Sequence, residues 1–176
     1  INAERLIDHA FGREPCLIED IKNYKSKSKS VSFSQILPRD YSFDEAKVVL
    51  MEMLYNGTRE LMKRHVITNK LEIMVGYSKE MIPATGGSVK MTVTTQLPSL
   101  MQPYLERIYA QTTVCNIPIR RIGLGFANVV DEACEGYDLF TDLGKVEKEH
   151  RRERTALELS KKYGKNTLLR GVDYLD

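Results

Sequence analysis

Residues suited to binding phosphate recur at every second position in three stretches of this 176-residue chain. Hydroxyl side chains and glycines alternate there with apolar residues, and lysine or arginine accompanies each run. Hydroxyls donate hydrogen bonds to phosphate oxygens, glycines let a ligand approach the main chain, and cations release the counterions of a nucleic acid. The residues of this set are Lys25, Lys27, Lys29, Ser30, Ser32, Ser34, Ser88, Lys90, Thr92, Thr94, Arg121, Gly123 and Gly125. Their chemistry fits a phosphate backbone bound without regard to base sequence.

The formal net charge of +2 conceals an uneven distribution of charge along the chain. Five basic residues and no acid lie between Asp20 and Asp40, and Glu106 is the only acid between Glu80 and Asp131. This segregation predicts one basic face.

Side chains that carry most enzyme chemistry are not clustered in the sequence. The three cysteines, Cys16, Cys115 and Cys134, and the three histidines are scattered, so we expect neither a metal site nor a disulfide framework. Paired acids lie at a helix start or beside linkers rather than in a metal-binding pattern. We therefore assign no catalytic residue and no cofactor, whereas an independent enzyme would need such a cluster.

The alternation of apolar side chains predicts four strands that would position the phosphate-binding set. The predicted strands are residues 25–37, 69–77, 88–96 and 119–127. We expect Pro38 to end the first strand and Gly86-Gly87 to form a turn before the third.

Two helices complete a β-α-β-β-α-β order. They are predicted to begin at Ser42 and Ser99, each followed by the Glu45 or Gln102 of a capping box. Two helices can cover only one face of a four-stranded, mainly antiparallel sheet, so this α+β fold leaves the other face open. The phosphate-binding set has the phase of the open face, whereas Arg120 has the phase of the core.

Other open-face functions remain possible from the residues alone. An ordinary solvent-facing sheet is also rich in serine, threonine and lysine. An RNA-recognition domain of the same order stacks bases on aromatic residues of its open face. Here Phe33, Tyr77 and Phe126 have the core phase, which favours binding of phosphates over stacking of bases.

The segments that flank the sheet are predicted to be separate units. Residues 1–24 contain two short helices, which we interpret as the end of a preceding domain. Residues 131–144 are acidic and turn-rich, which is typical of a linker, and 145–176 form a charged, solvated helix and tail. Because the chain begins at Ile1 rather than at a methionine, we expect it to be a piece of a longer protein. With no run of about 18 apolar residues, no signal peptide and few cysteines, we expect a cytoplasmic protein without membrane contact.

Two stretches resemble the little-finger, or polymerase-associated, domain of Y-family DNA polymerases. Residues 27–34, with their Lys-Ser-Lys-Ser start, and the Leu-Pro-Arg-Asp at 37–40 are similar to the opening strand of that domain. The Ile-Arg-Arg-Ile-Gly-Leu-Gly-Phe at 119–126 is similar to its last strand. The resemblance covers about residues 25–130 and implies the little-finger fold, with 1–24 as the end of the thumb domain.

The C-terminal part resembles the UmuC/ImpB/MucB/SamB-type group of error-prone, UV-protection polymerases of the SOS response. The resemblance rests on residues 137–140, the charged helix, 161–166 and 168–170. It implies a little finger that holds primer–template DNA during translesion synthesis. The implied DNA contacts are Lys27, Lys29, Ser30, Ser32, Ser34, Arg120 and Arg121, with Lys90, Thr92 and Thr94 placed by strand position only.

A second implied site is the Gly-Tyr-Asp-Leu-Phe at 136–140, which resembles the peptide by which bacterial polymerases bind the sliding clamp, roughly Gln-Leu-x-Leu-Phe. Tyr137, Leu139 and Phe140 would contact the clamp, although Gly136 replaces the usual glutamine. The alternative is that Leu139 and Phe140 pack against the following helix.

Two hypotheses follow for the function. The first is the DNA-binding C-terminal region of an error-prone Y-family polymerase. The alternative is a protein-interaction module that recruits the polymerase to the sliding clamp or to another SOS factor. In the family, the carboxylates that hold Mg²⁺ lie in a palm domain upstream of such a segment. We therefore expect this segment to be inactive alone and its parent to be a Mg²⁺-dependent, DNA-directed DNA polymerase.

Overall fold

The computed structural model describes residues 2–14, 16–24, 29–164 and 168, so Lys25 and Lys27 of the predicted DNA-binding set lie outside the described residues. Two short helices, α1 (Asn2–Ala10) and α2 (Ile18–Asn23), come first, as predicted. The domain that follows is built from β1 (Val31–Tyr41), α3 (Phe43–Lys63), β2 (Val66–Tyr77), β3 (Thr85–Thr95), α4 (Pro98–Thr112) and β4 (Ile119–Ala127). The chain then forms β5 (Val130–Asp131) and α5 (Leu143–Tyr163), with 3-10 turns at Ser78–Glu80 and Glu132–Cys134.

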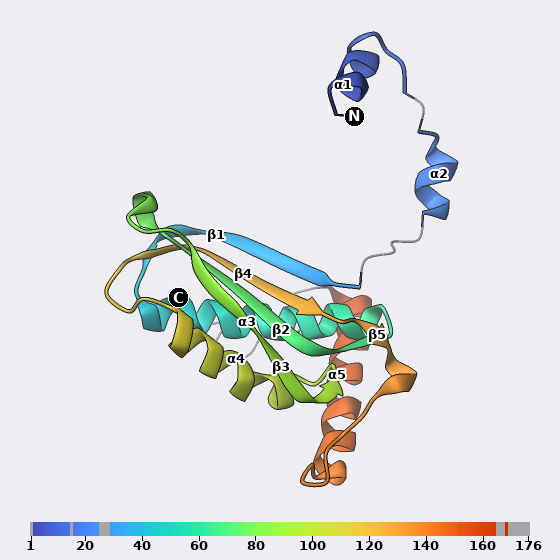
Figure 1. Ribbon diagram of the computed structural model, residues 1–176. Helices are drawn as coiled ribbons and strands as arrows, with labels where there is room; N and C mark the ends of the chain where they lie inside the picture. Colours follow the sequence, from blue (N-terminus) through green and yellow to red (C-terminus); the bar gives the residue numbers. More distant parts are fainter. Residues whose placement is uncertain (1, 15, 25–28, 165–167, 169–176) are drawn as a thin grey trace.

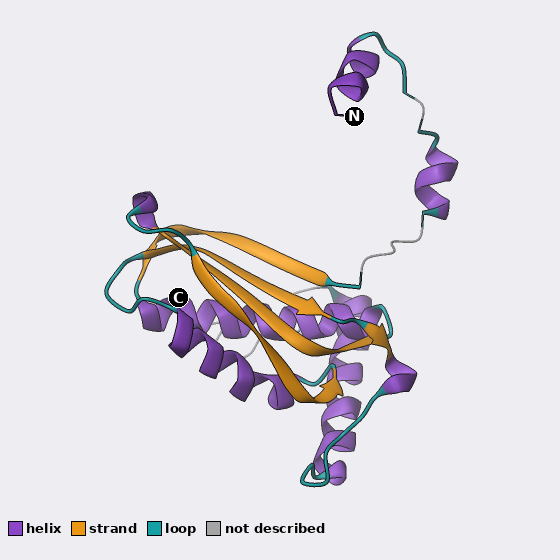
Figure 2. Cartoon of the chain, viewed as in Figure 1, coloured by secondary structure: helices purple, strands orange, loops and turns teal. Residues whose placement is uncertain are grey.

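The strands form a sheet in the order β1-β4-β2-β3, in which every neighbouring pair is antiparallel, and β5 pairs with one end of β2. Helices α3 and α4 cover one face, and the other face is open (Figures 1 and 2). The core between the helices and the sheet contains the fully buried Leu50, Leu71, Leu105 and Phe126. The predicted α+β fold and β-α-β-β-α-β order are confirmed.

Helix α3 begins with the predicted capping box. The Ser42 amide donates to a Glu45 carboxylate oxygen at 2.8 Å, and the Glu45 amide donates to the Ser42 hydroxyl at 3.4 Å. A hydrogen bond from Arg39, together with those from Ser42, lowers the pKa of Glu45 to about 2. Farther along α3, a β-carbon at Gly57 would lie 2.4 Å from the Phe126 ring, so this glycine lets the helix pack closely on the sheet.

The predicted bounds of three strands were wrong, and β2 begins at Val66 rather than at residue 69. Strand β1 continues through Pro38 to Tyr41, and its pairing with β4 is interrupted between Ile36 and Tyr41. Proline is tolerated there because β1 is an edge strand. Gly86-Gly87 lies inside β3 rather than in a turn.

The predicted capping box at Ser99 was also wrong. Helix α4 begins at Pro98 after Leu97, which makes no side-chain cap. Proline suits the first turn because its missing N–H needs no partner there. The amide and hydroxyl of Ser99 instead donate to the Glu149 carboxylate of α5.

The C-terminal helix is docked on the domain, contrary to the prediction of a solvated helix. Val146 and Leu157 of α5 are buried in a cluster with Met62 and Leu97. The segment between β4 and α5 is not a free linker either. It contains β5, and Gly136 exchanges two main-chain hydrogen bonds with Thr94.

Candidate nucleic-acid interface

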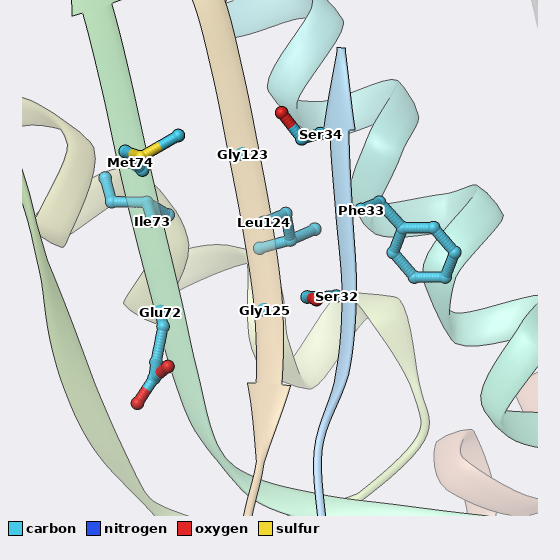
Figure 3. A pocket seen from close by; sticks show the side chains of 9 residues that line it. All are labelled: Ser32, Phe33, Ser34, Glu72, Ile73, Met74, Gly123, Leu124 and Gly125. Atoms are coloured by element: carbon cyan, nitrogen blue, oxygen red, sulfur yellow. The ribbon is translucent and has the colours of Figure 1, made fainter. Parts of the chain in front are cut away.

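A trough runs along the open face of the sheet because β4, between β1 and β2, contributes glycines there. Gly125 lies between Ser32 on β1 and Glu72 on β2. In the adjacent row along the sheet, Gly123 is flanked in the same way by a serine and a methionine (Figure 3). We define the glycine trough by the outward residues Ser32, Ser34, Glu72, Met74, Gly123 and Gly125, which line a hollow of about 360 Å³.

Cationic side chains lie at both ends of the glycine trough. At one end, Lys70 of β2 is paired in register with Lys90 of β3. At the other, Arg121 of β4 lies opposite Gly76 of β2. Lys70 and Gly76 are six residues apart on one strand, so the two ends are separated by roughly 20 Å.

Arg121 is positioned by a neighbour on each side. Its Nε donates to the Ser34 hydroxyl at 3.1 Å. On the other side, Gly76 leaves room for the arginine, since a β-carbon there would lie 3.1 Å from the Arg121 β-carbon. Arg121 is exposed, and among the described residues no carboxylate lies within 4.0 Å of its guanidinium. It therefore presents a positive charge at the end of the trough.

Arg120 takes a different direction from Arg121. The register of β4 against β2 shifts between Gly76 and Tyr77, which leaves Arg120 without an opposite residue. Its Nη1 lies 3.8 Å from the Asp40 carboxylate, which also accepts a hydrogen bond from Ser78. The position of Arg120 fits a structural role at the end of β4, where it pairs with Asp40. Its assignment as a phosphate contact stays a prediction.

The outward residues of β2 were missing from the predicted site. Glu72 places a carboxylate in the trough, and it accepts a hydrogen bond from the Lys70 ammonium at 2.7 Å. Both residues alternate with the buried Leu71 and Ile73, and this alternation was the signal that could have found them. The open face therefore carries, at the Arg121 end, a cation without a carboxylate partner among the described residues, whereas at the other end the charge of Lys70 is offset by the Glu72 carboxylate and Lys90 lies beside the pair.

Thr92 and Thr94 do not continue the face beyond Lys90. Strand β3 departs from regular pairing with β2 between Lys90 and Thr95. The Thr92 hydroxyl lies 2.8 Å from the Tyr104 hydroxyl of α4, and the Thr94 main chain pairs with Gly136. Lys29, Ser30, Ser88 and Lys90 are exposed, and the roles of all these residues in DNA binding stay predictions.

The three aromatic residues with core phase lie on the helix side, as expected. Tyr77 and Phe126 are buried, and the Phe33 ring meets Phe126 edge to face at 6.3 Å between centroids. The trough therefore gains no stacking platform from these residues.

A metal-binding cluster and a membrane-spanning helix are both absent from the described part of the chain. No group of three or more His, Cys, Asp or Glu side chains there is arranged to hold a metal ion. Within the same residues, no helix is both long and apolar enough to cross a membrane.

Residues 28–139, more than half of the sequence, match the model of the impB/mucB/samB family C-terminal domain. The chain belongs to the impB/mucB/samB family. This confirms the resemblance to the C-terminal region of Y-family polymerases, and the match ends before α5.

One solved structure is described as a complex of the beta-clamp processivity factor and the little finger domain of PolIV. It aligns with a TM-score of 0.45 and 12% sequence identity, over 64% of this chain and 99% of the matched chain. No curated protein matches the sequence.

The family match ends within a group of exposed apolar side chains on the loop before α5 and at the start of that helix. We call this group, Leu139, Phe140 and Leu143, the apolar tip. Leu139 is 100% exposed, Phe140 is 95% exposed and Leu143 is 62% exposed. The alternative in which Leu139 and Phe140 pack against the following helix is therefore wrong. Leu143 was not among the predicted clamp contacts, although it follows the motif by only three residues.

An aspartate turn shapes the loop that carries the tip. The Asp138 carboxylate accepts hydrogen bonds from the Thr141 hydroxyl at 2.6 Å and from the Phe140 amide at 3.1 Å. These bonds lower the pKa of Asp138, the bond from Thr141 most strongly.

Tyr137 points away from this tip. It is half-buried against the Met62–Leu97–Val146–Leu157 cluster, and its hydroxyl lies 3.1 Å from His150 Nε2. Burial, followed by a hydrogen bond to Glu135, raises the pKa of Tyr137. The three predicted clamp contacts are thus split between an exposed pair and an enclosed tyrosine.

Proposed function

We propose that this impB/mucB/samB domain binds primer–template DNA through the phosphate backbone, as the DNA-gripping part of an error-prone translesion polymerase of the SOS response. The single observation that carries the proposal is the glycine trough with cations at both ends. Arg121 supplies charge at one end, and Lys90 supplies it at the other, beside Lys70 and its carboxylate partner Glu72.

The spacing of these charges suits duplex DNA. The major groove is about 12 Å wide, so cations roughly 20 Å apart can meet phosphates on either side of a groove. Serine hydroxyls and glycine main chain between them offer close, neutral contact. Glu72 repels phosphate from the middle of the trough, which favours binding of the backbone at the ends.

DNA binding should depend little on base sequence and strongly on salt concentration, because the release of counterions drives it. We would titrate a labelled primer–template with the chain at two salt concentrations and follow fluorescence anisotropy. Arg121→Ala should weaken binding about fivefold at low salt for every sequence tested, since one phosphate contact is lost. Arg151→Ala, which removes the same charge from an exposed position of α5, is the matched control and should have little effect. Equal affinities for the unaltered chain and Arg121→Ala would contradict this placement of DNA.

The chemistry of the parent polymerase belongs to residues outside this domain. The carboxylates that bind Mg²⁺ and the incoming nucleotide would come from a palm domain of the longer protein. A primer-extension assay with Mg²⁺ should therefore give no product with this chain alone. Extension of the primer by this chain would contradict that assignment.

A second function, recruitment to the sliding clamp, is favoured by the exposure of Leu139 and Phe140. Two adjacent apolar side chains on a loop suit a preformed apolar pocket on a partner. The double substitution Leu139→Ala, Phe140→Ala should reduce affinity for a bacterial sliding clamp by at least about tenfold. Met81→Ala removes an exposed apolar side chain from the β2–β3 turn and serves as the control. Undiminished clamp binding by the double variant would remove these residues from the interface.

A further inference from the structure

The loop that carries the apolar tip is held at both ends. Before the loop, Gly136 and Thr94 exchange main-chain hydrogen bonds of 2.9 and 3.1 Å, which attach the chain to the edge of β3. After the loop, the Asp142 carboxylate accepts hydrogen bonds from the amides of Gly144 and Lys145 and starts α5. The position of the tip therefore depends on how firmly α5 is attached to the domain.

Helix α5 is attached by apolar and polar contacts along its length. Val146 and Leu157, three turns apart, are buried against α3 and the start of α4. Between them, Glu149 accepts hydrogen bonds from Ser99, and the buried Glu153 lies 3.9 Å from Arg59 of α3. Contacts spread in this way fix the direction of the helix as well as its position.

Tyr137 connects the attachment of the loop to β3 with the attachment of α5 to the domain. Its hydroxyl lies 3.1 Å from His150 Nε2 of α5, and the same nitrogen lies 3.0 Å from a Glu135 carboxylate oxygen. That carboxylate in turn accepts a hydrogen bond from Thr95 of β3 at 3.2 Å. These contacts connect the edge of β3, the start of the loop at residues 135–137, and α5, immediately next to the apolar tip.

We propose that Tyr137 and α5 form a brace that presents Leu139, Phe140 and Leu143 as one preformed apolar surface for the sliding clamp. This inference rests on the proposed clamp interaction and changes the role of Tyr137, which becomes a positioning residue rather than an anchor. Leu143 joins the surface because α5 begins at this residue, and the docked helix fixes the side from which it is presented. Folding of the domain has already ordered the loop, so binding loses little conformational freedom.

The role of Tyr137 can be tested because brace and anchor predict opposite results. Tyr137→Leu brings the sequence closer to the Gln-Leu-x-Leu-Phe pattern. If Tyr137 were an anchor, the leucine would maintain or strengthen clamp binding. If it is part of the brace, loss of the hydroxyl should weaken binding about threefold and speed amide hydrogen exchange over residues 138–142. A synthetic peptide of residues 135–143 provides the reference, because the same substitution there should not weaken binding.

The role of α5 can be tested at a distance from the tip. Leu157→Asp should undock the helix and weaken clamp binding about tenfold while leaving DNA binding unchanged. Thr155→Asp introduces the same carboxylate at an exposed position of α5 and should bind the clamp like the unaltered chain. Should Leu157→Asp fail to fold, as loss of DNA binding would reveal, Leu157→Ala gives a milder opening with an expected loss of about threefold.

The outcomes separate the brace from clamp recruitment itself. If the unaltered chain binds the clamp, and if the peptide and Leu157→Asp bind as tightly, the brace is refuted and recruitment stands. If the unaltered chain does not bind the clamp, both proposals are refuted. Weaker binding by the peptide and by Leu157→Asp, with Thr155→Asp unaffected, supports the brace.

Discussion

The glycine trough lies on three adjacent strands, whereas the apolar tip lies on a loop held by a strand edge and a docked helix. The trough owes its shape to side chains that β4 lacks, and the sheet supports it along its whole length. The tip owes its position to α5, which follows it directly, and to residues of α3 and α4 that are far away in the sequence. Each surface should therefore respond to substitutions that leave the other unchanged.

The largest effect on DNA affinity is expected when side chains fill the glycine trough. The same variant tests whether the trough and the apolar tip are independent surfaces. A β-carbon would find its nearest neighbours at 3.5 Å from Gly123 and 3.4 Å from Gly125, which is ordinary contact, so a side chain can begin at both positions on the open side. We expect the double variant Gly123→Val, Gly125→Val to lose at least about tenfold in DNA affinity, or about 1.4 kcal/mol. Because valine favours strands, the melting temperature should not fall.

Anisotropy titrations and thermal denaturation would measure both quantities for the valine variant. Clamp binding, followed by surface plasmon resonance, should remain unchanged. A fall in clamp affinity equal to the fall in DNA affinity would show that the sheet face and the tip act as one surface.

A smaller effect on DNA affinity is expected from the carboxylate of Glu72 in the glycine trough. Glu72→Gln removes the negative charge from the trough and weakens the hydrogen bond from Lys70, since the glutamine side chain accepts it without a charge. DNA affinity should rise about threefold at low salt and less at high salt, because salt screens the removed repulsion. Glu147→Gln makes the same change at an exposed position of α5 and should leave the affinity unaltered. Weaker DNA binding by Glu72→Gln would instead indicate that the carboxylate contacts the DNA, for example by accepting from a base amino group.

The smallest effect is expected where neither surface is involved. The pKa of Glu45 is lowered to about 2, so its ionised form stabilises the fold above the ordinary carboxyl pKa near 4.5. This stabilisation is lost as the pH falls from 4.5 through about 2. Glu45→Gln should therefore lower the melting temperature by a few degrees at pH 7, and the difference from the unaltered chain should shrink toward pH 2. Thermal denaturation at several pH values would check this, and a difference that does not change with pH would refute it.

Features that depend on local periodicity could be predicted from the sequence. Alternation around Leu71, Leu124 and Phe126 follows burial directly, so the order of strands and helices along the chain and the open face of the sheet were predicted correctly. The same alternation contained Glu72, whose place in the trough could have been predicted with the others.

Features that depend on distant partners could not be predicted in the same way. Ser99 has the pattern of a helix cap, but it bonds to Glu149, fifty residues away. Pro38 would end an inner strand, and only the strand order shows that β1 is at the edge. Tyr137 belongs to a motif that suggests exposure, yet His150 and the cluster around Leu157 hold it inside.

The order of the strands also bears on how this domain folds during synthesis. Strands β2 and β3 are neighbours in the chain and can pair as a hairpin soon after they emerge. Strand β1 emerges first, but its partner β4 is the last long strand, and the Ser34–Arg121 hydrogen bond joins residues 87 positions apart. Pairing across such a separation carries the full entropy cost of closing a long loop and slows folding. The serine wall of the trough should therefore form last, and a ribosome-bound chain that lacks β4 should expose β1 as an unprotected edge.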